Sequence, residues 1–395
     1  MHLGVKICFL FAALSVNARP GSPTTGKALY VLTNNANNAV IGLPIYKDGL
    51  LGDGQVTLTA GTGQNGLDST QGPAGPDSLF SQGAVAVAGQ YVFAVNPGSN
   101  TVSMLKSDRS NPSALTLVGQ PALVPGDFPS SVAVSSKSHL VCVGTTGARA
   151  GVSCTTYDSS GLGQMDRLRP FALNQTTPPV GVPNTLSHIL FSADESALFA
   201  TVKGDGSANN PGFFSAFPVH YGRSSETAAR LARKDVRSSP HDTGLLFGAT
   251  TSSCPGRVFV TDPGFGVAVL DVEEHTYKAT LLSKVVVPGQ AAVCWAAYSA
   301  RTNAVFITDV AVNRLVEIDA TDFSILSIAS LPNDGPGNVD LQVVGRHVYA
   351  LSPGNGTTEA AVTVFDTHRQ QQVQHVSLAK LGANRNATGM AYIDL

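Results

Sequence analysis

Charged residues are scarce in this sequence. Only 13% of the 395 residues are Asp, Glu, Lys or Arg, and 25 basic against 27 acidic residues give a formal net charge of −2. Binding to nucleic acid or to an anionic membrane surface depends on concentrated positive charge. We therefore expect neither nucleic acid nor a membrane as a partner.

Long hydrophobic runs are missing as well. A membrane-spanning helix needs about 20 apolar residues, whereas the apolar run near the start covers only residues 7–16. This run follows Lys6 and precedes Asn17 and Ala18, which is the order of a secretory signal peptide. We expect a signal peptide over 1–18, a short linker over 19–26 and a secreted chain.

Several catalytic motifs are absent. The sequence contains no G-x-S-x-G, H-E-x-x-H, P-loop or C-x-x-C motif. Lipase-type, zinc-protease and nucleotide-binding chemistry therefore have no support. We expect no cofactor and no metal.

Cysteine is rare but informative. One of the five cysteines lies in the predicted signal peptide, so four remain in an oxidising compartment. Cys142 and Cys154 flank the turn-like stretch 145–151 at equal distances, and a hairpin there would place them opposite one another within disulfide reach. By elimination, Cys254 and Cys294 are expected to form a second disulfide.

Three N-x-T sequons fit a secreted protein. They predict glycans on Asn174, Asn355 and Asn386.

One short pattern recurs seven times along the chain. Each copy is a β-rich run of about six residues that ends in a polar or turn-forming residue, and the copies occupy 28–34, 90–96, 139–145, 197–203, 257–262, 304–309 and 347–352. An apolar run precedes each later copy, and a third strand follows most of them. Such meanders at intervals of 43 to 62 residues are typical of propeller blades. We predict an all-β, seven-bladed β-propeller over 27–395.

The order of the strands predicts how this propeller closes. The chain begins with the second strand of a blade, 28–34, and ends with a first strand, 389–393. The last strand should complete the first blade, which removes an open sheet edge. A closed fold of this kind is expected to be a monomer.

Two insertions interrupt the regular spacing, at 61–80 and at about 205–242. Long loops are uncommon unless they are functional or disordered. We interpret both as segments that either cover one mouth of the channel or form surface loops.

Polar residues end all seven second strands and should form a ring at one end of the channel. Three of them, Lys203, Asp262 and Asp309, fall on consecutive blades, and His188 begins the first strand on the blade of Lys203. Carboxylates, an ammonium and an imidazole held together can perform acid–base chemistry. In this hypothesis Lys203 holds a substrate carboxylate. The alternative is that the aspartates only cap turns, which does not explain Lys203.

With the repeats established, the chain resembles the lactonase-type seven-bladed propellers. These include bacterial 6-phosphogluconolactonases and fungal 3-carboxymuconate cyclases, and the secreted fungal cyclase-like proteins are the most similar. The resemblance covers the chain from about residue 27 and is carried by residues 126–134, 142–154, 177–205, 289–310 and 387–392.

The resemblance implies metal-independent chemistry by a histidine at the head of an inner strand, together with acidic and arginine residues. In this sequence the position of that histidine falls on Ser187, next to His188, and the position of a glutamate falls near Cys294.

Two functions follow from these patterns. The first is a secreted enzyme of the lactonase or muconate-cyclase type that acts on a small carboxylated molecule. The second is a catalytically silent extracellular or cell-wall glycoprotein that binds a ligand or partner. A proton-transfer pair converging on the channel would favour the first, and a sealed channel the second.

Overall fold

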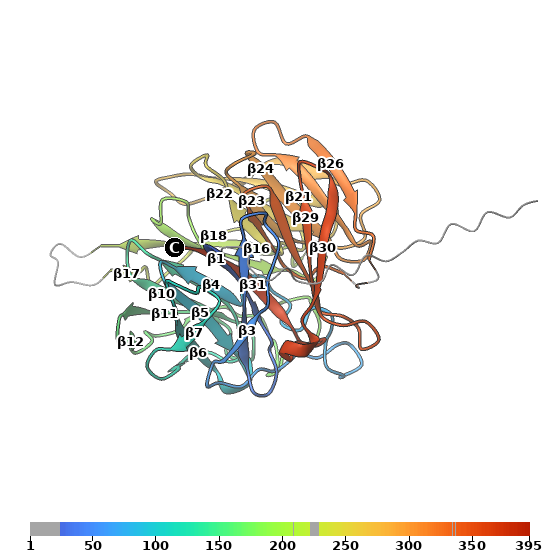
Figure 1. The fold of residues 1–395 in the computed structure, drawn as a ribbon. Coiled ribbons are helices and arrows are strands. Elements are labelled where there is room, and N and C mark those ends of the chain that lie inside the picture. The colour runs from blue at the N-terminus through green and yellow to red at the C-terminus, as the bar shows by residue number, and fades with distance from the viewer. Residues whose placement is uncertain (1–23, 208, 222–228, 334, 336) are drawn as a thin grey trace, which may run out of the picture.

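The structure is a computed structural model that describes residues 24–207, 209–221, 229–333, 335 and 337–395. The predicted signal peptide and most of the linker lie outside the described residues. In the described part, 31 strands form seven antiparallel sheets, accompanied by two short 3-10 helices, η1 (Pro97–Ser99) and η2 (Ala379–Leu381). Figure 1 shows the sheets arranged around a centre. The predicted seven-bladed β-propeller is confirmed.

The first strands of the seven blades surround the axis. They are β31 (Thr388–Asp394), β4 (Val85–Ala88), β9 (Pro129–Ser135), β14 (Leu186–Phe191), β19 (Ala249–Thr251), β23 (Val293–Ser299) and β27 (Leu341–Val344). The second strands are β1 (Thr24–Leu32), β5 (Tyr91–Asn96), β10 (Leu140–Thr145), β15 (Ala197–Lys203), β20 (Arg257–Asp262), β24 (Ala304–Asp309) and β28 (His347–Ser352). Six of these second strands end at the residue that the repeat pattern predicted.

The third and outer strands complete each sheet. The third strands are β2 (Ala39–Tyr46), β6 (Thr101–Ser107), β11 (Gly151–Asp158), β16 (Gly212–His220), β21 (Gly266–Val272), β25 (Arg314–Asp319) and β29 (Ala361–Asp366). The outer strands are β3 (Gln55–Leu58), β7 (Leu115–Leu117), β8 (Ala122–Leu123), β12 (Gly161–Leu162), β13 (Arg169–Pro170), β17 (Arg230–Leu231), β18 (Val236–Ser238), β22 (Ala279–Val286), β26 (Ile325–Ser330) and β30 (Gln371–Ser377).

The second predicted insertion, 205–242, is largely part of a blade. Its described residues contain β16, which pairs with β15, and the short strands β17 and β18, which both pair with β16. A long hairpin rather than a separate loop therefore accounts for the wide repeat interval.

The ends of the chain close the propeller in one sheet. β31 pairs antiparallel with β1, with Tyr30 opposite Ala391 and Lys27 opposite Asp394, so the last strand occupies the first-strand position of the N-terminal blade. The predicted closure is confirmed.

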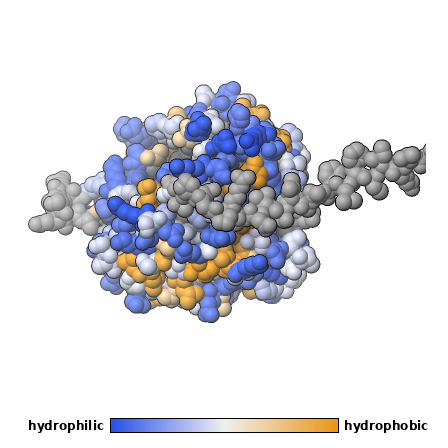
Figure 2. Space-filling view, viewed as in Figure 1, coloured by the Kyte–Doolittle hydropathy of each residue, from blue (hydrophilic) through white to orange (hydrophobic). Residues whose placement is uncertain are grey.

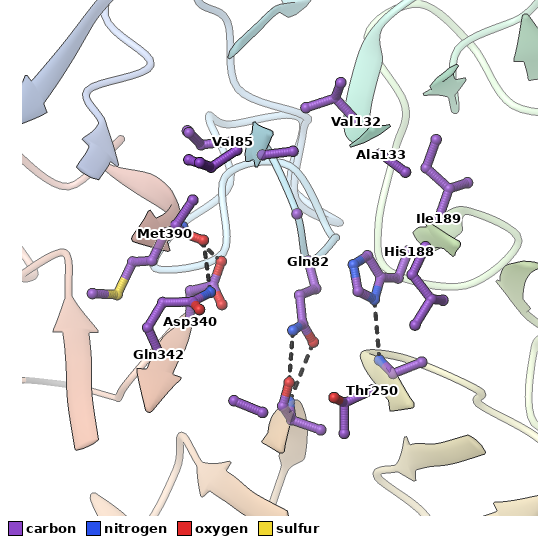
Figure 3. Close-up of a pocket in the computed structure, with 18 of the residues that line it drawn as sticks. Gln82, Val85, Val132, Ala133, His188, Ile189, Thr250, Asp340, Gln342 and Met390 are labelled. Atoms are coloured by element: carbon purple, nitrogen blue, oxygen red, sulfur yellow. Dashed lines mark hydrogen bonds between the residues drawn. The ribbon is translucent and has the colours of Figure 1, made fainter. Parts of the chain in front are cut away.

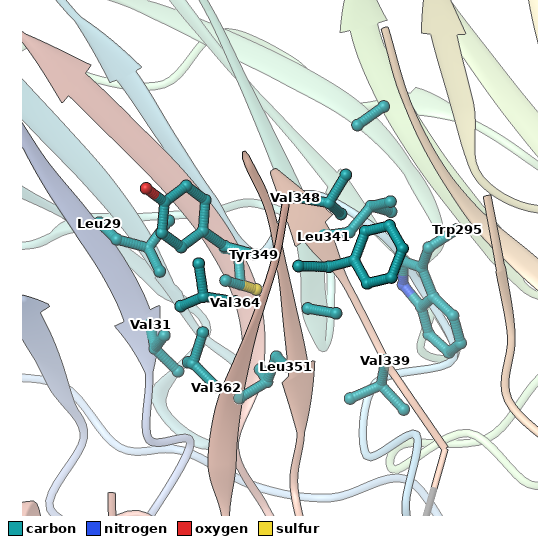
Figure 4. Close-up of a cluster of buried hydrophobic side chains, with 14 of the residues drawn as sticks. Leu29, Val31, Trp295, Val339, Leu341, Val348, Tyr349, Leu351, Val362 and Val364 are labelled. Atoms are coloured by element: carbon teal, nitrogen blue, oxygen red, sulfur yellow. The ribbon is translucent and has the colours of Figure 1, made fainter. Parts of the chain in front are cut away.

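Apolar contacts between neighbouring blades form the core. Every residue of β10, β15, β24 and β28 is buried, because each of these sheets is covered on both faces. Figure 4 shows one such cluster, in which Leu29, Tyr349 and Val364 pack together while Trp295 and Val339 lie near Leu341. In the outer strand β26, half-buried and exposed residues alternate along the strand.

The visible surface is mainly hydrophilic. Figure 2 shows its largest orange area low in the view, where Figure 1 labels β3 and β7, and Val56 and Leu58 of β3 are indeed exposed. No helix in the described ranges is long and apolar enough to cross a membrane.

One of the two predicted disulfides forms. Cys142 and Cys154 are register partners on β10 and β11, with Cα atoms 4.0 Å apart, and are joined. The predicted Cys254–Cys294 disulfide is wrong, since both thiols are free. The Cys294 carbonyl accepts a hydrogen bond from Gly248 N–H, just before β19 begins, whereas Cys254 lies in the turn after β19 ends. The pairing was predicted only because these two cysteines were left over, and the sequence does not show that a strand separates them.

We predict that deleting residues 388–395 prevents stable folding. The deletion removes β31 and leaves both the edge of β1 and a gap at the axis uncovered. Circular dichroism and size-exclusion chromatography should show unfolded or aggregated protein. As a control in the same strand pair, Asp394→Asn breaks only the half-exposed ion pair with Lys27 and should change stability by less than about 1 kcal/mol. A truncated protein that melts like wild type would contradict the closure.

The thiols give a second test of the fold. In a chain that begins at residue 19, we predict that a maleimide modifies Cys254 in the native protein and Cys294 only after unfolding, because Cys254 is exposed and Cys294 is buried. Mass spectrometry without reductant should find one label in the native protein and two in the unfolded protein. No label after unfolding would mean that the rejected disulfide exists.

Candidate functional site

The first insertion, 61–80, covers one mouth of the channel. The end of this insertion and the two residues after it close the channel. We call residues 78–82 the plug. All five plug residues are buried. On one side the Gln82 amide pairs with the backbone of β23, donating to the Ala296 carbonyl at 2.8 Å and accepting from Ala296 N–H at 3.2 Å. On the other side Gln82 N–H donates to the Ser187 carbonyl at 2.8 Å. The plug therefore bridges separate blades across the axis.

Lys203 holds this plug in place. Its Nζ donates to the Phe80 carbonyl at 2.6 Å and to Ser187 Oγ at 2.8 Å, and lies 4.2 Å from the centre of the Phe247 ring. Burial lowers the pKa of Lys203, while the charge of Asp77 opposes that shift. Sequence analysis singled out Lys203 but missed Asp77 and Phe80, because both belong to the insertion and not to the repeat.

Asp262 and Asp309 accept hydrogen bonds from turns. Asp262 accepts from the N–H groups of Gly244 and Leu245, at 2.9 and 3.2 Å, and Asp309 accepts from Ala292 N–H at 2.9 Å. Asp309 also forms a buried ion pair with Arg314, at 3.0 Å. These are the turn-capping contacts that the sequence analysis offered as the alternative.

Beyond the plug, the channel becomes a blind cavity of about 370 Å³. Residues from the first strands of all seven blades line it, and Gln82 and Gly83 form part of its floor. The four predicted site residues therefore do not share one open mouth. Lys203, Asp262 and Asp309 lie at the plugged end, and only His188 lines the cavity.

His188 presents a single hydrogen-bond donor to this cavity. The side chain is only 8% exposed, and its Nδ1 accepts a hydrogen bond from Ala249 N–H at 3.2 Å, so the ring hydrogen resides on Nε2. Burial lowers the pKa of His188 to about 3 and keeps the ring neutral. Nε2 has no hydrogen-bond partner among the described residues.

Gly83 leaves room for the His188 ring. Its φ is +82°, and a Cβ at this position would lie 2.8 Å from His188 Nε2. Any other residue here would be strained and would press on the imidazole.

Asp340 is the second ionisable group at the floor, and sequence analysis missed it. Its carboxylate accepts hydrogen bonds from the N–H groups of Leu341 and Met390, each at 2.8 Å. Burial nevertheless raises the pKa of Asp340 to about 7. Figure 3 shows Gln82 between Asp340 and His188. The only sequence signal was an acidic residue directly before a first strand.

The chemistry available at this floor is acid–base chemistry. A neutral imidazole N–H can polarise a carbonyl, and a carboxyl with a pKa near neutrality can take up and return a proton. Within the described ranges, no group of three or more His, Cys, Asp or Glu side chains is placed to hold a metal ion.

Comparisons with known proteins identify the type of propeller. No family model and no curated protein sequence matches the chain. Among solved structures, the periplasmic gluconolactonase of Pseudomonas aeruginosa matches with a TM-score of 0.64 and 15% identity, over 93% of this chain and 99% of that one. A candidate 6-phosphogluconolactonase of Bacteroides uniformis matches with a TM-score of 0.63 and 11% identity, over 93% and 100%. A candidate 6-phosphogluconolactonase of Bacteroides fragilis matches with a TM-score of 0.62 and 10% identity, over 93% of this chain and 98% of that one.

At these identities the comparisons show the fold alone, a seven-bladed β-propeller that this chain shares with those proteins. They do not show the specificity of the fungal cyclases.

The burial of His188 predicts a pH effect on stability. Below pH 6.5 the unfolded chain protonates this ring, whereas the folded chain resists protonation until about pH 3, so the ring lowers stability as the pH falls through that window. We expect His188→Gln to remove a penalty of about 3 kcal/mol at pH 4 relative to pH 7. Urea unfolding of both proteins at both pH values measures the difference. Parallel pH profiles would show that His188 is not buried in neutral form.

Proposed function

We propose that this protein is a secreted enzyme that hydrolyses a small lactone in the axial cavity. The observation that carries the proposal is the unpartnered Nε2–H of the buried His188, which points into a blind cavity that also contains Asp340. The cavity volume lies at the lower end of the range for small-molecule sites, about 300 to 1,000 Å³. The lactonase-type fold supports the same reaction class.

The two side chains have complementary roles in this reaction. The carbonyl oxygen of the lactone accepts the hydrogen bond from His188 Nε2–H, which stabilises the negative charge that develops on it. Ionised Asp340 takes a proton from a water molecule as the water oxygen bonds to the carbonyl carbon. The ring C–O bond then breaks, and the leaving oxygen takes the proton back from Asp340. The sum is lactone plus water giving a hydroxy acid.

Lys203 has a supporting role in this mechanism. The substrate carboxylate that the sequence hypothesis assigned to it would have to displace the Phe80 carbonyl and Ser187. We therefore propose that Lys203 keeps the plug, and hence the cavity floor, in position.

Secretion fits the covalent structure. Disulfides such as Cys142–Cys154 persist in oxidising compartments. Asn174 and Asn355 are exposed and can accept glycans, whereas Asn386 is half-buried and its Nδ2 donates to Asn35 Oδ1 at 3.3 Å. We propose glycans on the first two sites, and we do not expect one on Asn386.

A second function also has an observation in its favour. Because the plug seals the polar ring, a catalytically silent extracellular or cell-wall glycoprotein that binds a ligand in the remaining cavity is the alternative.

We predict that the purified protein opens the ring of small lactones faster than water does, as followed by acid release at pH 7. Asp340→Asn should lower kcat by about 10²- to 10⁴-fold, because it removes the proton acceptor. Lys203→Met should lower the melting temperature because it releases the plug, and it should lower kcat of the folded protein much less than Asp340→Asn, since the ammonium does not line the cavity. A Lys203→Met protein that melts like wild type but loses as much kcat as Asp340→Asn would return the site to the polar ring. Binding without ring opening by wild type would favour the silent alternative.

A further inference from the structure

The charges of the cavity lining restrict the ligand. Among the described residues, the ionisable side chains that line it are His188, Asp340, Tyr298 and Tyr392, with no lysine or arginine. Lys203, the lysine of the predicted site, does not line the cavity. Its ammonium group donates hydrogen bonds to the Phe80 carbonyl and to Ser187 at the plugged end. His188 stays neutral because burial depresses its pKa. The described residues therefore supply no positive charge to the cavity.

The hydrogen-bonding groups of the lining favour hydroxyl groups over anions. Gln342 donates through Nε2 to the Met390 carbonyl at 2.8 Å, and its Oε1 has no partner among the described residues. Ala296 uses the oxygen and one N–H of the Gln82 amide. Apart from threonine hydroxyls, the floor thus offers a few uncharged donors, which are His188 Nε2–H and the second N–H of the Gln82 and Gln342 amides. Its acceptors are Gln342 Oε1 and Asp340.

A phosphate or carboxylate would meet the wrong partners here. Such groups only accept hydrogen bonds when ionised, and they need several donors or a cation to replace their hydration. The cavity instead presents Asp340, whose pKa burial raises to about 7, so that above this pH its carboxylate repels an anion. A hydroxylated neutral ring matches both the uncharged donors and the acceptors.

We infer that the axial cavity selects an uncharged, hydroxyl-bearing lactone and excludes its phosphorylated or carboxylated counterparts. The inference rests on the proposed function, because it places the lactone in the same cavity. It separates this chain from enzymes that act on phosphorylated or carboxylated lactones, although the fold is shared.

Stable ring analogues test this selectivity without turnover. We would measure, by isothermal titration calorimetry on the full secreted chain, the binding of gluconolactam and of its 6-phosphate, which are lactams and do not open. Wild type should bind the neutral lactam at least about tenfold more tightly, because the phosphate would be buried without a cation. His188→Gln should weaken binding of the neutral lactam.

A cation placed in the lining provides the matched comparison. Thr251 lines the cavity and is half-buried, so Thr251→Lys should restore binding of the phosphorylated lactam, and Thr251→Met, of similar length but uncharged, should not. Equal or tighter binding of the phosphorylated lactam by wild type would overturn the inference. Selective binding of the neutral lactam without any lactone hydrolysis would support the inference and refute the proposed catalysis. If neither lactam binds, the cavity is not the ligand site and both proposals fail.

Discussion

A buried ammonium holds the interior of this propeller together. Lys203 donates to the Phe80 carbonyl and to Ser187 Oγ beneath the polar ring, and so ties the plug to the blade of β15. A lysine without water is costly unless its donors are used. The plug supplies the missing acceptor, and in return the lysine fixes the plug. The positions of Gln82 and Gly83, which form part of the cavity floor, depend on this contact.

The plug turns a channel open at two ends into a cavity open at one. The remaining opening of the cavity lies on the side opposite the polar ring. The floor combines distant parts of the chain, because Gly83 leaves space for His188 and the Asp340 carboxylate accepts from Met390 N–H in the last strand. Closure of the propeller by β31 is thus also a condition for the site. A truncated chain would lose both the fold and one wall of the cavity.

The seven-bladed propeller fold tolerates different interiors. Seven sheets around an axis place seven first strands at one radius, and the side chains at their ends decide what binds there. In this chain Ser187 accepts a hydrogen bond from Lys203 at the plugged end. The neighbouring His188 lines the cavity beyond the plug. Two successive residues of β14 therefore face different depths of the channel.

Features that arise from local and periodic patterns could be predicted from the amino-acid sequence. Strand runs and turns have short-range signals, so the seven repeats, the closure by residues 389–393 and the opposed pair Cys142 and Cys154 were all predictable. The capping alternative for Asp262 and Asp309 was equally visible, since a strand-end carboxylate lies next to the turn that it caps.

Contacts that cross the propeller axis could not be predicted in this way. The partner of Lys203 is Phe80, more than a hundred residues earlier, and no repeat signal marks it. Asp340 and His188 share one floor because separate blades meet there, and Cys254 and Cys294 are kept apart because β19 separates them. Contacts between distant residues depend on how seven sheets pack around one centre, and a linear pattern does not contain that geometry.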